Sequence, residues 1–367
     1  MEPFKNRIGP HAVAQITQLV AGEWDPHGFE RRALAGLDAL ELKDRVIHVA
    51  DALRASLPAD YPTALGQILA GLPESPDHTN ELTERFELWP LCTFVERHGL
   101  AHPDLSLDAM PALTALWSCE FAIRPYFQAD PEHVLRRLAS WVDHDNVHVR
   151  RLVSEGSRPR LPWGIRLQHR IDHPERMLPL LERLRDDPEE YVRRSVANHL
   201  NDIAKDHEDL VLDVAADWLR DAPAPRRKLV KHALRTHIKA GNPRAYGLIG
   251  LQPFVGTVQT ALSPAGIAVG EAVHLDVTLT SSAKRNQRVR LDYGVHHLRK
   301  NGSRTAKVFH WTERTVKPGE TLVLRKSHTV AKVSTRALYA GQQALDLRVN
   351  GEPTEAWPFD LDLRSQR

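Results

Sequence analysis

Apolar residues recur at helical spacing along the first two thirds of the chain. From residue 37 to about residue 250 they return every three or four positions, as at Leu42, Val46, Val49 and Leu53. Pro and Asp interrupt the pattern about every fifteen to twenty residues. Residues with this spacing share one face of a helix, and Pro and Asp mark helix ends. The pattern therefore predicts a stack of antiparallel helices.

A short stretch of sequence returns at intervals within this helical region. Residues 149–154 resemble residues 192–197, 43 positions later. Residues 227–232 in turn align with residues 193–198, after 34 more positions. Intervals of this size hold one helix pair in HEAT-like repeats, which stack into a solenoid with a concave face. Adjacent residues on a helix point about 100° apart, so one of two neighbouring basic side chains can face the concavity. The basic residues expected to face it are Arg151, Arg194, Lys231 and Arg235.

After Gly250 the periodicity changes to short alternating runs such as residues 272–279, which is typical of strands. Turn residues separate these runs at Pro264, Gly270, Asn301–Gly302 and Pro318–Gly319. Six to eight runs in about 115 residues predict an immunoglobulin-like β-sandwich, while a barrel would have the same periodicity.

The fold class expected is therefore mainly α, a HEAT-like solenoid followed by an all-β domain. We place the helical domain at residues 1–252 and the β domain at residues 253–367. The chain of 367 residues is 42% hydrophobic, but none of its stretches approaches the roughly 18 uncharged apolar residues of a membrane span. Its first residues lack the basic-then-apolar order of a signal peptide. We expect a cytoplasmic monomer.

The formal net charge of +2 hides an asymmetry between the two parts of the chain. Residues 251–367 hold 17 Lys and Arg against 10 Asp and Glu, and residues 284–348 hold 15 against 4. Such a local excess is typical of a surface that binds a polyanion. The alternative is a basic surface that serves only solubility.

Glu120 is the only charged residue between Ala109 and Ile123. A carboxylate on an apolar helix costs several kcal/mol unless it is paired or faces a cavity. The functional interpretation is a catalytic carboxylate. The alternative is a buried ion pair with Arg124, four residues later.

Glu155 is expected in the last turn of a helix, directly before Gly156, a residue suited to a left-handed C-terminal cap. The negative end of the helix dipole disfavours a charged carboxylate at that place. Such an unfavourable position indicates a functional role. The alternative is an exposed ion pair with Arg151, four residues earlier, which would contribute little stability.

The connection that follows Glu155 is rich in Pro and Arg and ends at Trp163. Arg158 and Arg160 are expected to hold phosphates, and Trp163 is expected to meet the face of a nucleotide. Trp163 as a core anchor between two repeats is the alternative.

Pairs of histidines stand four residues apart at His144 and His148 and at His169 and His173. Asn146 between the first pair indicates an inter-helix turn with an N-cap, and neither pair has a fixed third ligand. The two cysteines, Cys92 and Cys119, lie in unrelated helical contexts and are expected to be buried. We expect no metal and no cofactor.

Four groups of residues resemble the AlkC-type DNA alkylation repair glycosylases, relatives of the AlkD group. The groups are Leu40–Val46 with Leu57–Tyr61, Glu120 with Ala122–Pro125, Ser154–Gly156 with Arg158–Trp163, and Ser195–Asn198 with Leu200–Lys205. In the β region, residues 291–293 and 307–309 resemble the immunoglobulin-like domain of one AlkC subgroup.

The resemblance implies a HEAT-like domain that holds duplex DNA in its concave face. It implies excision of cationic N3-alkylated bases, 3-methyladenine and 3-methylcytosine, without turning the base out of the helix. The positions that match the family's active site are Glu120, Glu155 and Trp163, with Arg151 close by.

Two other functions fit the same helical repeats. A HEAT scaffold would use its concave face to bind a protein partner and would have no catalytic activity. A DNA-binding protein without enzyme activity would keep only the basic surfaces.

Overall fold

The computed structural model describes residues 3–73, 82–333 and 336–363. The chain forms two compact units, the first from residues 1–211 and 222–233, the second from residues 212–221 and 234–367. Within the described residues, none of the helices is both long and apolar enough to cross a membrane.

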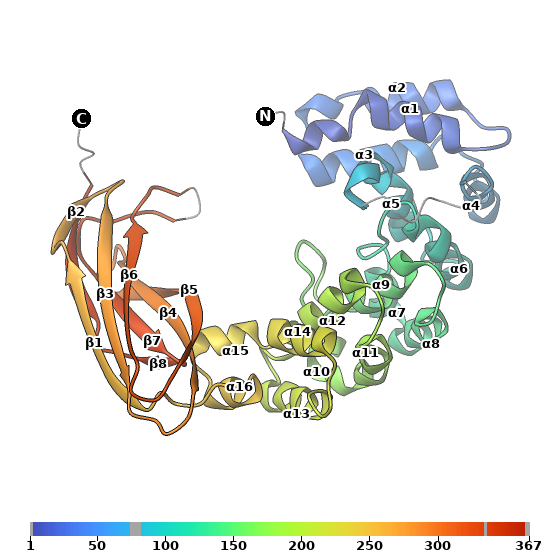
Figure 1. The fold of residues 1–367 in the computed structure, drawn as a ribbon. Coiled ribbons are helices and arrows are strands. Elements are labelled where there is room, and N and C mark those ends of the chain that lie inside the picture. The colour runs from blue at the N-terminus through green and yellow to red at the C-terminus, as the bar shows by residue number, and fades with distance from the viewer. Residues whose placement is uncertain (1–2, 74–81, 334–335, 364–367) are drawn as a thin grey trace. The chain divides into compact units, whose positions relative to one another are not determined.

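The first unit is built of helices, drawn from blue to yellow-green in Figure 1. Its α-helices are α1 (Pro10–Leu19), α2 (Pro26–Leu34), α3 (Leu42–Arg54), α4 (Tyr61–Ala70), α5 (Trp89–His98), α6 (Pro103–Thr114), α7 (Arg124–Ala129), α8 (Pro131–Trp141), α9 (Val147–Glu155), α10 (Gln168–Asp172), α11 (Leu178–Leu184), α12 (Glu190–Ile203) and α14 (Ala224–Ala233). Helix α13 (Glu208–Trp218) spans the division between the units. Short 3-10 helices are η1 (Phe4–Arg7), η2 (Leu37–Ala39), η3 (Leu82–Leu88) and η4 (Pro174–Arg176).

The Asp and Pro residues that interrupt the apolar pattern begin helices, as predicted. Asp25, Asp60 and Asp130 are the N-caps of α2, α4 and α8, and each side chain accepts a hydrogen bond from a backbone N–H of the first turn. Asn146 caps α9 in the same way. Each cap satisfies a backbone donor that the helix cannot pair itself, which fixes where the helix starts.

The repeats expected from the sequence lie side by side, since α9 packs against α12 and α12 against α14. The first arginines of the α9 and α12 repeats have the same structural role. Arg150 Nη1 donates to the carbonyl oxygens six and five residues before it, and Arg193 Nη1 donates to the two equivalent oxygens of its own repeat. Arg150 Nε also donates to Asp187 Oδ2 at 2.6 Å, which links the two repeats.

The second unit consists of two helices followed by a β domain, drawn in orange and red in Figure 1. The helices are α15 (Arg235–Ala240) and α16 (Pro243–Leu248), and the strands are β1 (Gly256–Ser263), β2 (Gly266–Ala268), β3 (Ala272–Ser281), β4 (Gln287–Leu298), β5 (Arg304–Val316), β6 (Thr321–Thr329), β7 (Gly341–Val349), β8 (Glu352–Pro353) and β9 (Trp357–Asp362). One sheet has the order β1-β3-β6, and the other has the order β2-β9-β7-β4-β5 with β8 beside β7.

Both sheets contribute to a single core. On β3 the apolar residues Val273, Leu275, Val277 and Leu279 are at most 1% exposed and alternate with half-buried residues, as the period of two predicts. They cluster with Leu291 and other buried residues of the second sheet. This arrangement is a sandwich and not a barrel. The predicted turn residues all lie between strands.

The change from helix to strand falls between Leu248 and Gly256. The compact units divide the chain earlier, because α15 and α16 bond to the β strands. Tyr246 Oη donates to Asp292 Oδ2 at 3.2 Å, and Arg348 Nη1 donates to the carbonyl oxygen of Lys239 at 3.3 Å. The domain boundary at residue 252 stays a prediction.

Candidate active site

Glu120 lies in a series of turns between α6 and α7, so the expectation that it sits on an apolar helix is wrong. Helix α6 ends at Thr114, whose Oγ1 accepts a hydrogen bond from the backbone N–H of Cys119 at 3.0 Å. This bond closes the turn that directly precedes Glu120.

Glu120 uses only one of its carboxylate oxygens within the described structure. Its Oε2 accepts from Ser118 Oγ at 2.9 Å and from Arg151 Nη1 at 2.8 Å. No described residue donates to Oε1, and the side chain is 17% exposed. The alternative ion pair with Arg124 is also wrong, because that guanidinium donates to two backbone carbonyl oxygens. Glu120 therefore has one oxygen available to water or to a ligand.

Glu155 is the last residue of α9 and is buried. Its Oε1 accepts from Arg158 Nη1 at 2.6 Å and lies 3.6 Å from Arg151 Nη2. Its Oε2 accepts from Ser195 Oγ at 2.6 Å. Unlike Glu120, it has both oxygens occupied.

The electrostatics of Glu155 differ from the expectation based on the helix dipole alone. Burial raises the pKa of this carboxyl, but the charges of Arg151 and Arg158 and the Ser195 hydroxyl outweigh burial and hold the pKa below its ordinary value. The charged form is therefore favoured, although the helix end disfavours it.

Gly156 does not form the expected left-handed cap, since its φ of −66° is right-handed. It is packed closely instead. A Cβ at this position would lie 2.8 Å from Ile123 Cγ2 and 3.0 Å from the carbonyl oxygen of Leu152. The glycine is needed for the close approach of α9 to the segment that follows Glu120.

Arg151 lies between the two carboxylates instead of on an exposed stripe. It bonds to Glu120 and approaches Glu155, and its guanidinium stacks 4.8 Å from the ring centroid of Tyr191. Burial lowers the pKa of Arg151, but the two carboxylates more than compensate and raise it above the ordinary value. Arg194, its equivalent in the next repeat, is exposed, and its place on the concave face stays a prediction.

Arg158 is 7% exposed, so it differs from the phosphate-binding arginine that the sequence predicts. Its Nε donates to Asp202 Oδ2 at 2.8 Å, while Nη1 donates to Glu155. Arg158 therefore stabilises the Glu155 carboxylate, because both groups to which it donates, Glu155 and Asp202, are anions. Arg160 is more exposed and pairs with Asp206 through two bonds of 3.0 and 2.8 Å.

Trp163 is 66% exposed, so the alternative of a core anchor is wrong. Its φ of 66° is unusual for a residue other than glycine and costs about 1 kcal/mol or more. Lys43 Nζ donates to the Trp163 carbonyl oxygen, and Arg124 Nε donates to that of Ile165 at 2.7 Å. Two cations thus hold this strained loop in place.

Trp163 also lines a cavity of about 170 Å³ together with Phe121, the residue that follows Glu120. The exposed indole and the Glu120 turn therefore lie in one region of the first unit.

Lys231 lies on α14 in the first unit, whereas Arg235 begins α15 in the second. Each has an interaction within the structure. Their place on one stripe with Arg194 stays a prediction.

Sequence reasoning missed the residues that hold the site together. Ser195 could have been found, because it stands where the preceding repeat has Leu152 and thus puts a hydroxyl at an apolar repeat position. Lys43, Arg124 and Asp202 had no such signal, since their partners are distant in the sequence.

The cysteines are both buried, as expected, but the expectation of unrelated helical contexts is wrong: Cys119 lies in a turn, and its Sγ lies 3.5 Å from that of Cys92. Among the residues that the structure describes, no group of three or more His, Cys, Asp or Glu side chains is placed to hold a metal ion.

We expect His199 on α12 to make the stability of the protein dependent on pH. The side chain is fully buried, Nδ1 contacts the Ser154 carbonyl oxygen at 2.9 Å, and burial lowers its pKa to about 4. Between pH 6.5 and 4 the unfolded chain binds this proton and the folded chain does not. The free energy of unfolding is therefore highest above pH 6.5, and protonation of this residue lowers it by at most about 3 kcal/mol as the pH falls to 4. Denaturant unfolding at pH 7 and pH 5 should show this loss for the native chain and a smaller one for His199→Gln. Equal losses would exclude this residue as the cause.

The DNA alkylation repair enzyme family model matches residues 114–244, and the model of the YhaZ C-terminal Ig-like domain matches residues 257–363. The chain is 36% identical over 324 residues to the uncharacterized protein YhaZ of Bacillus subtilis, covering 88% of each chain. It is 34% identical to the Pseudomonas fluorescens alkylpurine DNA glycosylase AlkC, solved bound to DNA containing an abasic site analog. That match has a TM-score of 0.89 and covers 98% of this chain and 100% of the other.

These matches confirm the predicted order of a helical repeat region and an immunoglobulin-like domain. They cover both compact units and not only the helices. The chain belongs to the AlkC-like DNA alkylation repair family.

Proposed function

We propose that this chain is a DNA glycosylase that hydrolyses the N-glycosidic bond of N3-alkylated bases in duplex DNA. The observation that carries the proposal is the pair of carboxylates joined through Arg151, in a chain 34% identical to an alkylpurine DNA glycosylase solved with abasic-site DNA. The exposed Trp163 lines a cavity with Phe121, the neighbour of Glu120 in the sequence. The bases proposed as substrates are 3-methyladenine and 3-methylcytosine.

Cleavage of this bond requires no catalytic group that acts on the base itself. An N3-alkylated base carries a positive charge and leaves without a general acid. As the bond breaks, the positive charge moves to the deoxyribose, where fixed anions stabilise it. Two carboxylates are therefore sufficient for this hydrolysis, and a general acid is not needed.

The hydrogen bonds favour different roles for the two carboxylates. Glu120 has an available oxygen and is partly exposed, so it would contact the attacking water or the sugar. Glu155 has both oxygens bonded and is buried, so it would act through its charge and by holding Arg151 in place. Arg151 would in turn hold the Glu120 carboxylate in its orientation.

Trp163 is proposed to lie against the damaged nucleotide. An electron-rich indole face attracts a cationic base, with an energy of about 0.5 to 2 kcal/mol. The strained backbone of an exposed residue is typical of a functional position, because folding alone would favour another residue there.

Trp163→Gly is expected to lower excision about tenfold, because the contact with the cationic base is lost. The free energy of unfolding should stay within about 1 kcal/mol of the native value, since glycine relieves the φ of 66° while it adds chain entropy. Single-turnover excision and denaturant unfolding measure the two effects. Trp163→Phe, which keeps an aromatic face, is the control. Unchanged excision by the glycine variant would exclude Trp163 from the site.

Incubation of the protein with randomly methylated duplex DNA tests the proposed activity. We expect free 3-methyladenine in the supernatant and abasic sites in the DNA. A protein scaffold would release nothing and would bind DNA no better at low salt. A DNA-binding protein without activity would show salt-dependent affinity alone. Either result would contradict the proposal.

A further inference from the structure

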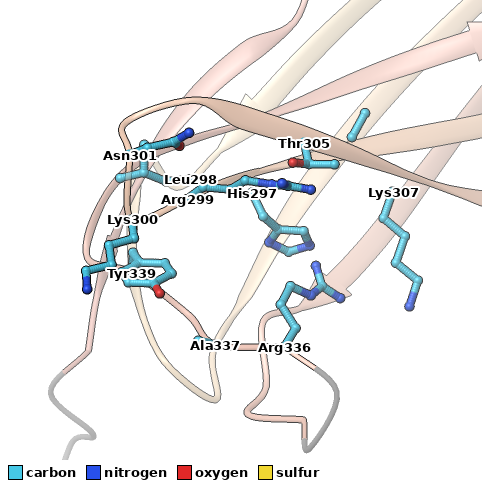
Figure 2. Close-up of a pocket in the computed structure, with 11 residues that line it drawn as sticks. His297, Leu298, Arg299, Lys300, Asn301, Thr305, Lys307, Arg336, Ala337 and Tyr339 are labelled. Carbon is cyan, nitrogen blue, oxygen red and sulfur yellow. The ribbon is translucent and has the colours of Figure 1, made fainter.

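The β domain contains a pocket that is separate from the carboxylate site. It has a volume of about 620 Å³ and lies where β4 and β5 join, with one wall formed by the segment before β7 (Figure 2). A volume of this size holds a ligand as large as a nucleotide. Every residue that lines it belongs to the second compact unit.

The charges in this pocket are all of one sign. Its lining includes Arg299, Lys300, Lys307 and Arg336, and no Asp or Glu is among the described residues that line it. Like charges gathered in a concave surface repel one another and raise the local concentration of anions. The pocket also has hydroxyl groups, from Thr305 and Tyr339.

His297 forms part of the pocket wall. In Figure 2 its ring lies above the Arg336 side chain, and Lys307 lies to the right of both. It is 7% exposed, and neither ring nitrogen has a hydrogen-bond partner among the described residues. A buried polar group without a partner costs about 1 to 3 kcal/mol, so this position indicates a ligand that would complete its hydrogen bonds.

Burial and the charges of Arg336 and Lys307 lower the pKa of His297 to about 4. The imidazole is therefore neutral near pH 7 and still offers one N–H. The cations around it would supply the charge, and the ring would supply a directed hydrogen bond.

We propose that this pocket is a phosphate-binding site in which the cations hold the anion and His297 donates to one of its oxygens. The ligand is a phosphorylated group, which is supplied either by the backbone of bound DNA or by a small phosphorylated molecule. The site does not depend on the proposed glycosylase function, because a phosphate can bind here whether or not the chain cleaves DNA.

Inorganic pyrophosphate added to the full-length protein tests the site, with binding followed by titration calorimetry. The native chain should bind one equivalent, and the double variant K307A/R336A should bind at least tenfold more weakly. Its matched control is K284A/R285A. This pair removes the same charge from the other end of β4, where both residues are exposed and neither lines the pocket.

His297→Ala provides a second test, since it removes the hydrogen bond without changing the charge near pH 7. We expect weaker pyrophosphate binding by a variant that is still folded, and a melting temperature measured beside the titration checks the folding. Three outcomes would overturn the proposal: no saturable binding to the native chain, equal losses in both double variants, or native affinity in K307A/R336A.

The same variants identify the source of the phosphate. If K307A/R336A also weakens duplex binding more than K284A/R285A does, and pyrophosphate competes with the duplex, the site holds a backbone phosphate. If duplex binding is unaffected, the site holds a small phosphorylated molecule. Both results support a phosphate site, and excision activity enters neither measurement.

Discussion

Glu120→Gln should lower the single-turnover rate of base excision by about 100- to 1,000-fold, the range typical of losing one electrostatic stabiliser of a transition state. Glutamine keeps the shape of the side chain and can still accept from Arg151 and Ser118, but it removes the negative charge. DNA affinity should hardly change, because this carboxylate attracts no phosphate.

The folded state should tolerate Glu120→Gln, because the side chain is partly exposed and lies in a turn. A melting temperature measured beside the rate separates a catalytic effect from unfolding. A variant that is strongly destabilised yet excises normally would instead make Glu120 a structural ion-pair partner.

Glu155→Gln should lower the free energy of unfolding by about 3 to 5 kcal/mol, the range for removing one partner of a buried ion pair. The change leaves Arg158 with Asp202 alone and removes the second carboxylate near Arg151, in a site that is almost closed to solvent. Excision should also slow, because Glu155 no longer supplies a negative charge next to Arg151. Denaturant unfolding and single-turnover excision measure the two effects.

Asp206→Asn is the matched control for Glu155→Gln. It also removes the carboxylate partner of an arginine, here Arg160, but in this pair both side chains are at least 25% exposed. Exposed pairs contribute about 0 to 1 kcal/mol. If both variants lose the same free energy of unfolding, the hydrogen-bonded cluster around Glu155 stabilises the fold no more than an exposed ion pair does.

The architecture could be predicted from the sequence because its causes are local. Helix starts at Asp25 and Asp60 depend on a side chain and a backbone N–H a few residues away, and the alternation on β3 depends on a period of two. The first arginines of the repeats bond to their own preceding loops, so their recurrence indicated a repeated structure.

The site could be predicted only in part because its contacts are not local. Glu120 was found because one charge stood in an apolar stretch, but Arg151, its partner, is 31 residues away. Ser195, which completes the bonds of Glu155, is 40 residues away. The sequence therefore singled out the two carboxylates that Arg151 joins, but the surroundings expected for both were wrong, including a helix for Glu120 and a left-handed cap at Gly156.

If Glu120 and Glu155 stabilise positive charge on the sugar, the protein should distinguish two duplexes that differ only in the charge at that position. One duplex carries a cationic pyrrolidine in place of the deoxyribose, and the other carries the neutral tetrahydrofuran analogue. We predict that the native chain binds the cationic duplex at least tenfold more tightly and that Glu120→Gln loses most of this preference. Equal affinity of the native chain for both duplexes, or a preference that survives in Glu120→Gln, would contradict the claim.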